Sequence, residues 1–107
     1  MGKATADGFD QAVTVGEASL AALNAATPWR AFEGLFNFDL AGTFVATIVI
    51  ERSFDGGVTA RPCTAQGQPV SFTAPASEAL QAGEEGVLYR ARVSAYTSGA
   101  AQARLSQ

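Results

Sequence analysis

The chain has 107 residues and a mass of 11.0 kDa, the size of one domain with a core just large enough to fold alone. Its net charge of −3 and pI of about 4.7 exclude a cationic surface for nucleic acid, and 48% hydrophobic residues exclude a disordered chain. Charged residues make up only 16%. Because scattered charges keep small domains apart, we expect neighbours in an assembly to cover part of the surface.

The sequence contains no histidine and a single cysteine, Cys63. Ser-His-Asp catalysis, Cys-His catalysis and histidine-containing zinc sites are therefore excluded, and one thiol cannot build a metal cluster or an intrachain disulfide. We interpret Cys63 as a small apolar residue that fills space in a strand. The expectation is a protein without catalytic residues, without a cofactor and without a metal.

No membrane or export signal is visible in the sequence. Residues 1–10 lack an apolar stretch of the kind that a secretory signal needs. The longest nearly apolar run, residues 40–50, is too short for a membrane helix and is rich in β-branched residues. We expect synthesis in the cytoplasm and no membrane partner.

The first third of the chain allows two interpretations. Residues 11–16, "QAVTVG", predict a short strand, whereas residues 17–28, "EASLAALNAATP", favour either a short helix or an extended segment that lies on a neighbouring subunit. The helix alternative rests on alanine propensity and on the spacing of Leu20 and Leu23. We divide the chain into residues 1–29, an N-terminal arm with the first strand, and residues 30–107, a β-sandwich core.

From residue 30 the hydrophobic period is two, which is the period of a strand. Phe36, Phe38 and Leu40 fall on one face, with polar residues between them. The pair Ala41-Gly42 then predicts a tight connection into a second strand over residues 43–54. Both faces of this second strand are apolar, so we expect it to be central in its sheet.

Shorter strands follow. Residues 58–63 are predicted to return antiparallel after an Asp-Gly-Gly turn, with Pro62 at an edge, and residues 68–75 supply another short strand. Residues 76–86, "ASEALQAGEEG", are predicted as a loop or a single helical turn. Their pair Glu84-Glu85 lies next to glycines and is interpreted as a solvated corner, since neighbours on such a loop share no pocket for acid–base catalysis.

The last quarter shows the clearest strand of the sequence, over residues 87–96. Thr97-Ser98-Gly99 predicts a turn into a final strand, where Ala101, Ala103 and Leu105 alternate with polar residues. About seven short strands with regular turn signals indicate an antiparallel β-sandwich, Ig-like or jelly-roll-like, with an N-terminal arm or short helix.

The stretch "ERSFDGGVT", residues 51–59, fits the pattern S-x-D-x-G-x-T of the Asp-box turns in sialidase-like proteins. In such a turn the Asp side chain accepts backbone N–H groups and Gly supplies a positive φ. The full pattern ends in an aromatic residue, whereas this chain has Ala60. We therefore interpret the stretch as a hairpin turn rather than as a sugar site. Its structural residues are Ser53, Asp55, Gly56, Gly57 and Thr59.

Candidate interface residues come from two places in the sequence. Arg90 and Arg92 lie two apart on one strand face, where they form either a carboxylate clamp or cross-strand pairs with Glu51, Glu33 or a partner. Trp29 is the only tryptophan, and it is an interface anchor, a sugar-stacking platform or a core residue. The candidate interface set is Trp29, Arg30, Arg90 and Arg92.

The runs "FNFDLAGTFVATIVIERSFDGG" and "GEEGVLYRARVSAYTSGAAQARLSQ" resemble small virion proteins of tailed bacteriophages. Such proteins carry a phrase like G-T-[FW]-V-x-T-[IV]-x-[IL]-x-R-S-F-D-G-G, then G-V-x-Y-R, then Y-T-S-G, and a strand ending R-L-S-Q. The resemblance covers residues 34–107 and departs at residues 58–60, where an aromatic residue is expected. The matching residues are 42–57, 86–90, 96–99 and 104–107.

This resemblance implies a non-enzymatic structural protein of a phage particle. Among such proteins, a β-sandwich of 11 kDa is most similar to a capsid decoration (cement) protein, which bridges major capsid subunits on the outer surface of the head. It implies the major capsid protein as partner and a homo-trimer or other homo-oligomer. Residues 14–30, which the resemblance does not cover, are our candidate for a contact arm. A tail or fibre-base component and a carbohydrate-binding β-sandwich remain the alternatives.

Overall fold

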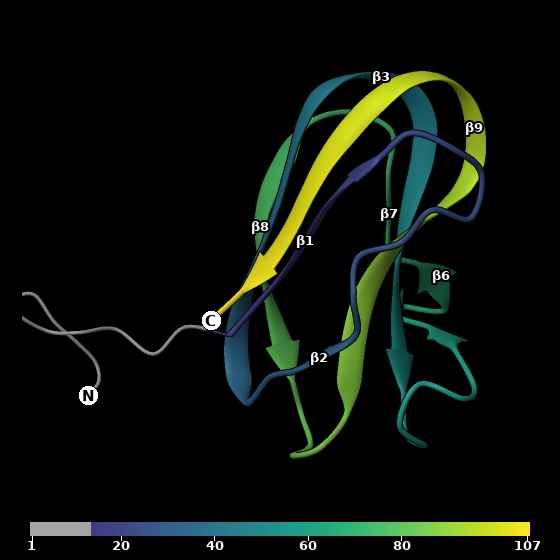
Figure 1. The fold of residues 1–107 in the computed structure, drawn as a ribbon. Helices are drawn as coiled ribbons and strands as arrows, with labels where there is room; N and C mark the ends of the chain where they lie inside the picture. The colour runs from purple at the N-terminus through teal and green to yellow at the C-terminus, as the bar shows by residue number, and fades with distance from the viewer. Residues whose placement is uncertain (1–13) are drawn as a thin grey trace, which may run out of the picture.

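The computed structural model describes residues 14–107, and within them every regular element is a β-strand (Figure 1). Seven strands form one antiparallel sheet and two form a small separate hairpin. The strands are β1 (Val15–Leu20), β2 (Arg30–Ala31), β3 (Gly34–Ser53), β4 (Arg61–Pro62), β5 (Thr64–Ala65), β6 (Gln68–Pro69), β7 (Ser71–Phe72), β8 (Ala76–Ala82) and β9 (Leu88–Ser106).

Two long strands, β3 and β9, organise the fold. They pair antiparallel almost from end to end, from Asn37 opposite Ser106 to Ser53 opposite Leu88. Both strands bend over a crest, at the top of Figure 1, so that each contributes one half to either layer of the molecule. We use the word crest for residues 42–48 of β3 and the residues of β9 that pair with them. Two register shifts within this range place extra residues on β9, and such bulges increase the bend of a strand pair.

The two layers follow from the strand pairings. In one layer, β8 pairs with the first half of β3, and β1 pairs with the last part of β9. In the other layer, β4 and β7 pair with the second half of β3, and β2 pairs with the first part of β9. Because β3 has neighbours on both sides, its predicted central position is confirmed. The predicted antiparallel β-sandwich is confirmed as well.

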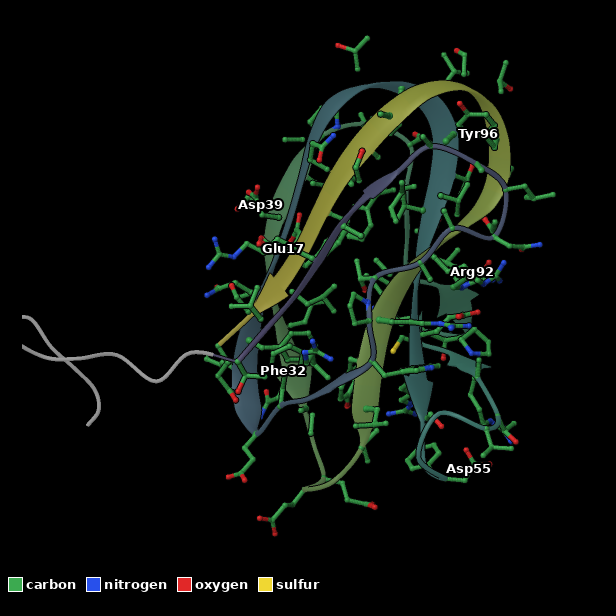
Figure 2. All side chains as sticks on the ribbon, viewed as in Figure 1. Glu17, Phe32, Asp39, Asp55, Arg92 and Tyr96 are labelled. Atoms are coloured by element: carbon green, nitrogen blue, oxygen red, sulfur yellow. The ribbon has the colours of Figure 1, made fainter. Side chains whose placement is uncertain are left out.

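Aromatic side chains fill the space between the layers. The rings of Phe32 and Phe36 stack with 4.5 Å between their centroids, and the ring of Tyr89 lies 4.9 Å from Phe36. Phe38 of one layer meets Phe72 of the other at 5.0 Å. The alternation predicted for residues 36–40 and 101–105 is confirmed, since all the inward residues are buried. Figure 2 shows Phe32 pointing between the layers.

The two turns predicted at Ala41-Gly42 and at Thr97–Gly99 are wrong. Both glycines do have a positive φ, 104° at Gly42 and 85° at Gly99, but the strands continue through them. Gly42 pairs with Ala101 and Gly99 with Phe44, so the two bends lie side by side in neighbouring strands. A coordinated bend keeps the hydrogen-bonded ladder intact, whereas a turn in either strand would break it.

The predictions for alanine-rich segments also need correction. The helix alternative for residues 17–28 is wrong: β1 pairs along β9, residues 22–24 form a turn, and residues 24–27 hydrogen-bond to β9. The loop predicted over residues 76–86 is wrong for β8, while Glu84-Glu85 is an exposed turn as predicted. In both cases an unpaired edge of a long strand outweighs local propensity. Residues 11–13 of the first predicted strand lie outside the described part of the chain.

The short predicted strands are confirmed only in part. Residues 58–63 return antiparallel, but only Arg61 and Pro62 pair with β3. Within residues 68–75, only Ser71 and Phe72 pair with β3, whereas Gln68 and Pro69 belong to the β5–β6 hairpin. No helix over residues 14–107 is long and apolar enough to cross a membrane.

Candidate functional site

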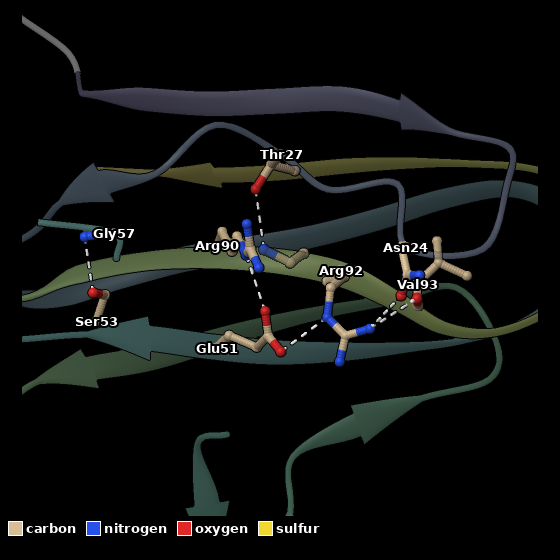
Figure 3. A network of polar contacts seen from close by, with 9 residues as sticks. Asn24, Thr27, Glu51, Ser53, Gly57, Arg90, Arg92 and Val93 are labelled. Carbon is tan, nitrogen blue, oxygen red and sulfur yellow. Dashed lines mark hydrogen bonds and ion pairs between the residues drawn. The ribbon is translucent and has the colours of Figure 1, made fainter. Parts of the chain in front are cut away.

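A buried carboxylate holds the two predicted arginines together (Figure 3). Glu51 of β3 lies opposite Arg90 of β9, and it accepts hydrogen bonds from Arg90 Nε and Arg92 Nε, each at 2.9 Å. Glu51 is 6% exposed, whereas the arginine side chains are about a quarter exposed. The cross-strand pairing with Glu51 is therefore confirmed. The Nε group of each guanidinium is already used, and Nη1 of Arg92 donates to Asn24, which leaves the outer nitrogens of Arg90 and Nη2 of Arg92 for a partner.

Trp29 lies beside this ion pair. The guanidinium carbon of Arg90 is 4.3 Å from the ring centroid, a distance typical of a cation–π contact. One face of the indole is therefore covered by Arg90, which leaves that face closed to a stacking sugar. Arg30 points elsewhere: it donates from Nε to the Val15 carbonyl of β1 at 2.9 Å. The structure thus brings together three of the four candidate interface residues.

The segment before Trp29 extends the same network along the edge of β9. Thr27 is buried, and its Oγ1 accepts the backbone N–H of Ala91 at 3.0 Å, while its own N–H donates to the Ala91 carbonyl. Asn24, with a φ of 68°, accepts a hydrogen bond from Arg92 Nη1 at 2.9 Å. Sequence reasoning missed both residues. The sequence does contain a pattern that argues against a helix in this segment, because Asn tolerates a positive φ and a residue before proline disfavours the helical conformation.

The turn after β3 is closed by side-chain hydrogen bonds. Ser53 Oγ donates to Asp55 Oδ1 at 2.7 Å and accepts the N–H of Gly57 at 2.9 Å. Asp55 Oδ1 also accepts the N–H of Thr59 at 2.8 Å. Gly56 and Gly57 both have positive φ. The geometry confirms the predicted role of the Asp and of the glycines, and Thr59 joins the turn through its backbone N–H and through a side-chain hydrogen bond to Asp55.

The aromatic residue that the turn lacks at position 60 comes from another part of the chain. A Cβ added to Gly57 would lie 2.9 Å from Cδ1 of Trp29, so the indole rests against the bare Cα of this glycine. The turn and the arginine pair are therefore joined through Trp29. We call the set Trp29, Glu51, Gly57, Arg90 and Arg92 the tryptophan cluster.

Replacing Gly57 by alanine tests this contact, with Gly56→Ala as the matched control. Both substitutions place a Cβ at positive φ, but only the Cβ of residue 57 meets the indole, since Gly56 has open space. We expect Gly56→Ala to lower the free energy of unfolding by about 1 kcal/mol, and Gly57→Ala by about 2 kcal/mol more. Urea denaturation followed by Trp29 fluorescence measures both. Equal losses in the two variants would contradict the contact.

Hydrogen bonds to Asp55 lower the pKa of its carboxyl group. The Thr59 N–H contributes most, then the Ser53 hydroxyl and then the Thr59 side chain, and the pKa falls from 3.8 to about 2. A carboxyl whose pKa falls on folding stabilises the fold above its unfolded pKa, and this contribution is lost as the pH falls through the folded pKa.

We therefore expect Asp55→Asn to lower the melting temperature at pH 7, and we expect the gap from the wild type to close between pH 4 and about 2. Thermal unfolding followed by circular dichroism at several pH values over this range measures the gap. A gap that stays constant across it would show that the charge of Asp55 does not support the turn.

A pocket lies away from the tryptophan cluster, at the open side between β8 and the β4–β7 region. It has a volume of about 190 Å³, and Cys63 forms part of its wall. Burial raises the pKa of the Cys63 thiol, which agrees with its interpretation as an apolar filler. Within residues 14–107 no group of three or more Cys, Asp or Glu side chains could hold a metal ion.

Comparison with known proteins finds no matching protein family, no matching curated protein and no matching solved structure.

Proposed function

We propose that this chain is a non-enzymatic structural protein of a tailed-phage particle, namely a decoration protein that binds the outer surface of the head. One observation supports the proposal most. The four sequence phrases that resemble virion proteins come from two separate parts of the sequence, residues 42–57 and residues 86–107. The first falls on β3 and the turn after it, and the others fall on β9 or lead into it, and these two strands pair with each other. The phrases therefore describe one bent ribbon and the turn at its end.

The shape of this ribbon suits a protein that bridges subunits. Its two long strands are hydrogen-bonded to each other through both layers. A mechanical force on one end is therefore carried by the backbone hydrogen bonds between β3 and β9 rather than by a flexible hinge. The molecule measures 43 × 29 × 24 Å, which is enough to contact two neighbours at a junction. Many copies on one shell would convert modest contacts into a large total stabilisation.

The contact surface is proposed to include the tryptophan cluster and the turn beside it. Phe54 and Val58 of this turn are 54% and 85% exposed, and the turn touches Trp29 through Gly57. Aromatic residues and Arg are enriched in protein interfaces, and Trp and Arg are frequent among the residues that dominate binding. In Figure 2 the turn, marked by Asp55, lies at the end of the molecule away from Tyr96 and the crest.

The test is binding to heads that lack the protein. Expanded heads from a phage deleted for this gene are mixed with the purified protein, and bound protein is counted after sedimentation. We expect saturable binding with hundreds of copies per head and a higher melting temperature of the shell. Heads that already carry the protein should bind no more. The charge-introducing variant Val58→Asp should bind more weakly while it melts like the wild type.

Other outcomes would point elsewhere. No saturable binding to the heads would overturn the proposal, and recovery of the protein in the tail fraction would favour the tail or fibre-base alternative. Sedimentation equilibrium of the free protein tests the proposed homo-trimer.

A further inference from the structure

One side of β8 has backbone groups that no described segment uses. The N–H groups of Thr14 and Gln107 each donate to the other residue's carbonyl, which fixes the residues of β9 that face β1. In an antiparallel sheet, successive residues direct their backbone groups to opposite neighbours. The residues of β9 that face β1 determine which residues of β9 face β3, and these in turn determine which residues of β3 face β8. By this alternation, the backbone N–H and C=O groups of Ser77, Ala79 and Gln81 point away from β3. Within residues 14–107, β3 is the only strand that pairs with β8.

The pocket of about 190 Å³ lies next to this edge. Leu80 and Gln81 of β8 form one side of it, and Cys63 and Val70 form part of the opposite side. A somewhat smaller apolar cavity, of about 150 Å³, is known to hold benzene. The pocket therefore has room for one large apolar side chain. The remaining lining residues are Phe36, Ile50, Arg52, Thr64 and Tyr89.

The carboxylate of Glu78 influences which strands can pair with the β8 edge. It lies opposite Phe38, which is fully buried, so its side chain belongs to the core-facing side of the sheet, yet Glu78 is exposed. Neither ion pair of the described residues involves it. Inward charges on edge strands are a known device against pairing between copies. Two β8 strands paired about Ala79 would bring two such carboxylates onto one face, which disfavours a second copy of this chain.

We propose that the β8 edge binds an extended segment of another protein, which adds to the sheet as a further strand. Its backbone pairs with Ser77, Ala79 and Gln81. One large apolar side chain enters the pocket beside Leu80, and a basic side chain two residues away lies opposite Glu78. The spacing of two follows from the alternation of side chains along a strand. This peptide site is additional to the proposed head-binding role and does not depend on it.

The test uses a blocked nonapeptide, Thr-Thr-Thr-Lys-Thr-Leu-Thr-Thr-Thr, added to the ¹⁵N-labelled full chain at millimolar concentration. We expect amide shift changes at Ser77, Ala79 and Gln81 and along the pocket walls. Two control peptides replace Lys by Glu or Leu by Ala. Since opposite charges stabilise a cross-strand pair and like charges destabilise it, the Glu peptide should bind about fivefold more weakly.

Two variants of the protein complete the test. Ala79→Pro removes an outward N–H without removing a bond to β3, and it should abolish binding that the matched variant Ala79→Ser retains. Glu78→Lys should reverse the preference, so that the Glu peptide binds better than the Lys peptide. This reversal does not depend on the proline variant being folded. Absent shift changes, shifts confined to another surface, or an unchanged preference in Glu78→Lys would overturn the proposal.

Discussion

Replacing Gly99 by alanine is expected to lower the free energy of unfolding by about 3 kcal/mol or more. Gly99 has a φ of 85°, and a Cβ at this position would fall against the Thr43 carbonyl oxygen and 2.7 Å from the Cα of Phe44. Both obstacles are backbone atoms of the paired strand, so neither can rotate away. The substitution therefore combines left-handed strain with a clash at the crest. Urea denaturation measures the loss.

Gly86→Ala is the matched control for this substitution. Gly86 has nearly the same φ, 87°, but a Cβ there has open space around it. It should cost only the conformational strain, about 1 kcal/mol. If Gly99→Ala does not fold at all, the same contrast appears as loss of soluble protein in one variant only. Equal stability of the two variants would show that the crest can open to accept a side chain.

The second large effect is expected at Glu51. Glu51→Ala leaves two guanidinium groups without their shared carboxylate, and breaking a buried ion pair on one side costs about 3–5 kcal/mol. Because Arg90 and Arg92 are 24% and 26% exposed, water compensates them in part, and we expect a loss near the lower end, about 3 kcal/mol. Trp29 fluorescence should also change, since Arg90 covers the indole.

Glu17→Ala provides the comparison. Glu17 is an exposed residue that lies opposite Arg104 on the outer side of β1, and substitution of such a surface charge changes stability by about 0.5 kcal/mol or less. Chemical denaturation of both variants at one ionic strength gives the difference. A loss at Glu51 no larger than the loss at Glu17 would mean that the arginines find equivalent partners in water.

The sequence predicted the sandwich because its strand signals are strong. Period-two alternation at Phe36, Phe38 and Leu40 depends only on which face is buried, and it is visible without knowledge of the partner strand. The pairing of Glu51 with Arg90 is one of four alternatives that the sequence leaves open, because a cross-strand partner depends on register. Register is set here by two bulges in β9 that have no distinct sequence signature.

The failures share one cause. The sequence predicts turns at Gly42 and Gly99 because glycine readily adopts the positive φ that many turns need. The sequence of one strand does not show that the neighbouring strand bends at the same place. Likewise, β8 is alanine-rich, and its sequence alone favours neither strand nor loop. It forms a strand because it pairs with the first half of β3. The contact between Trp29 and Gly57 joins residues from separate segments, and the sequence around either residue contains no pattern that predicts it.

The pairing of β3 with β9 also bears on how the chain reaches its fold. Contacts between these strands join residues such as Glu51 and Arg90, 39 positions apart, and at the far end Gln107 bonds to Glu33, 74 positions away. Such separations give a high contact order, and β-proteins of this kind refold in about milliseconds to seconds. Stopped-flow refolding monitored by Trp29 should fall in this range. Until β9 is made, β3 has no partner of its own length, and the pairing of β9 along β3 then completes both layers.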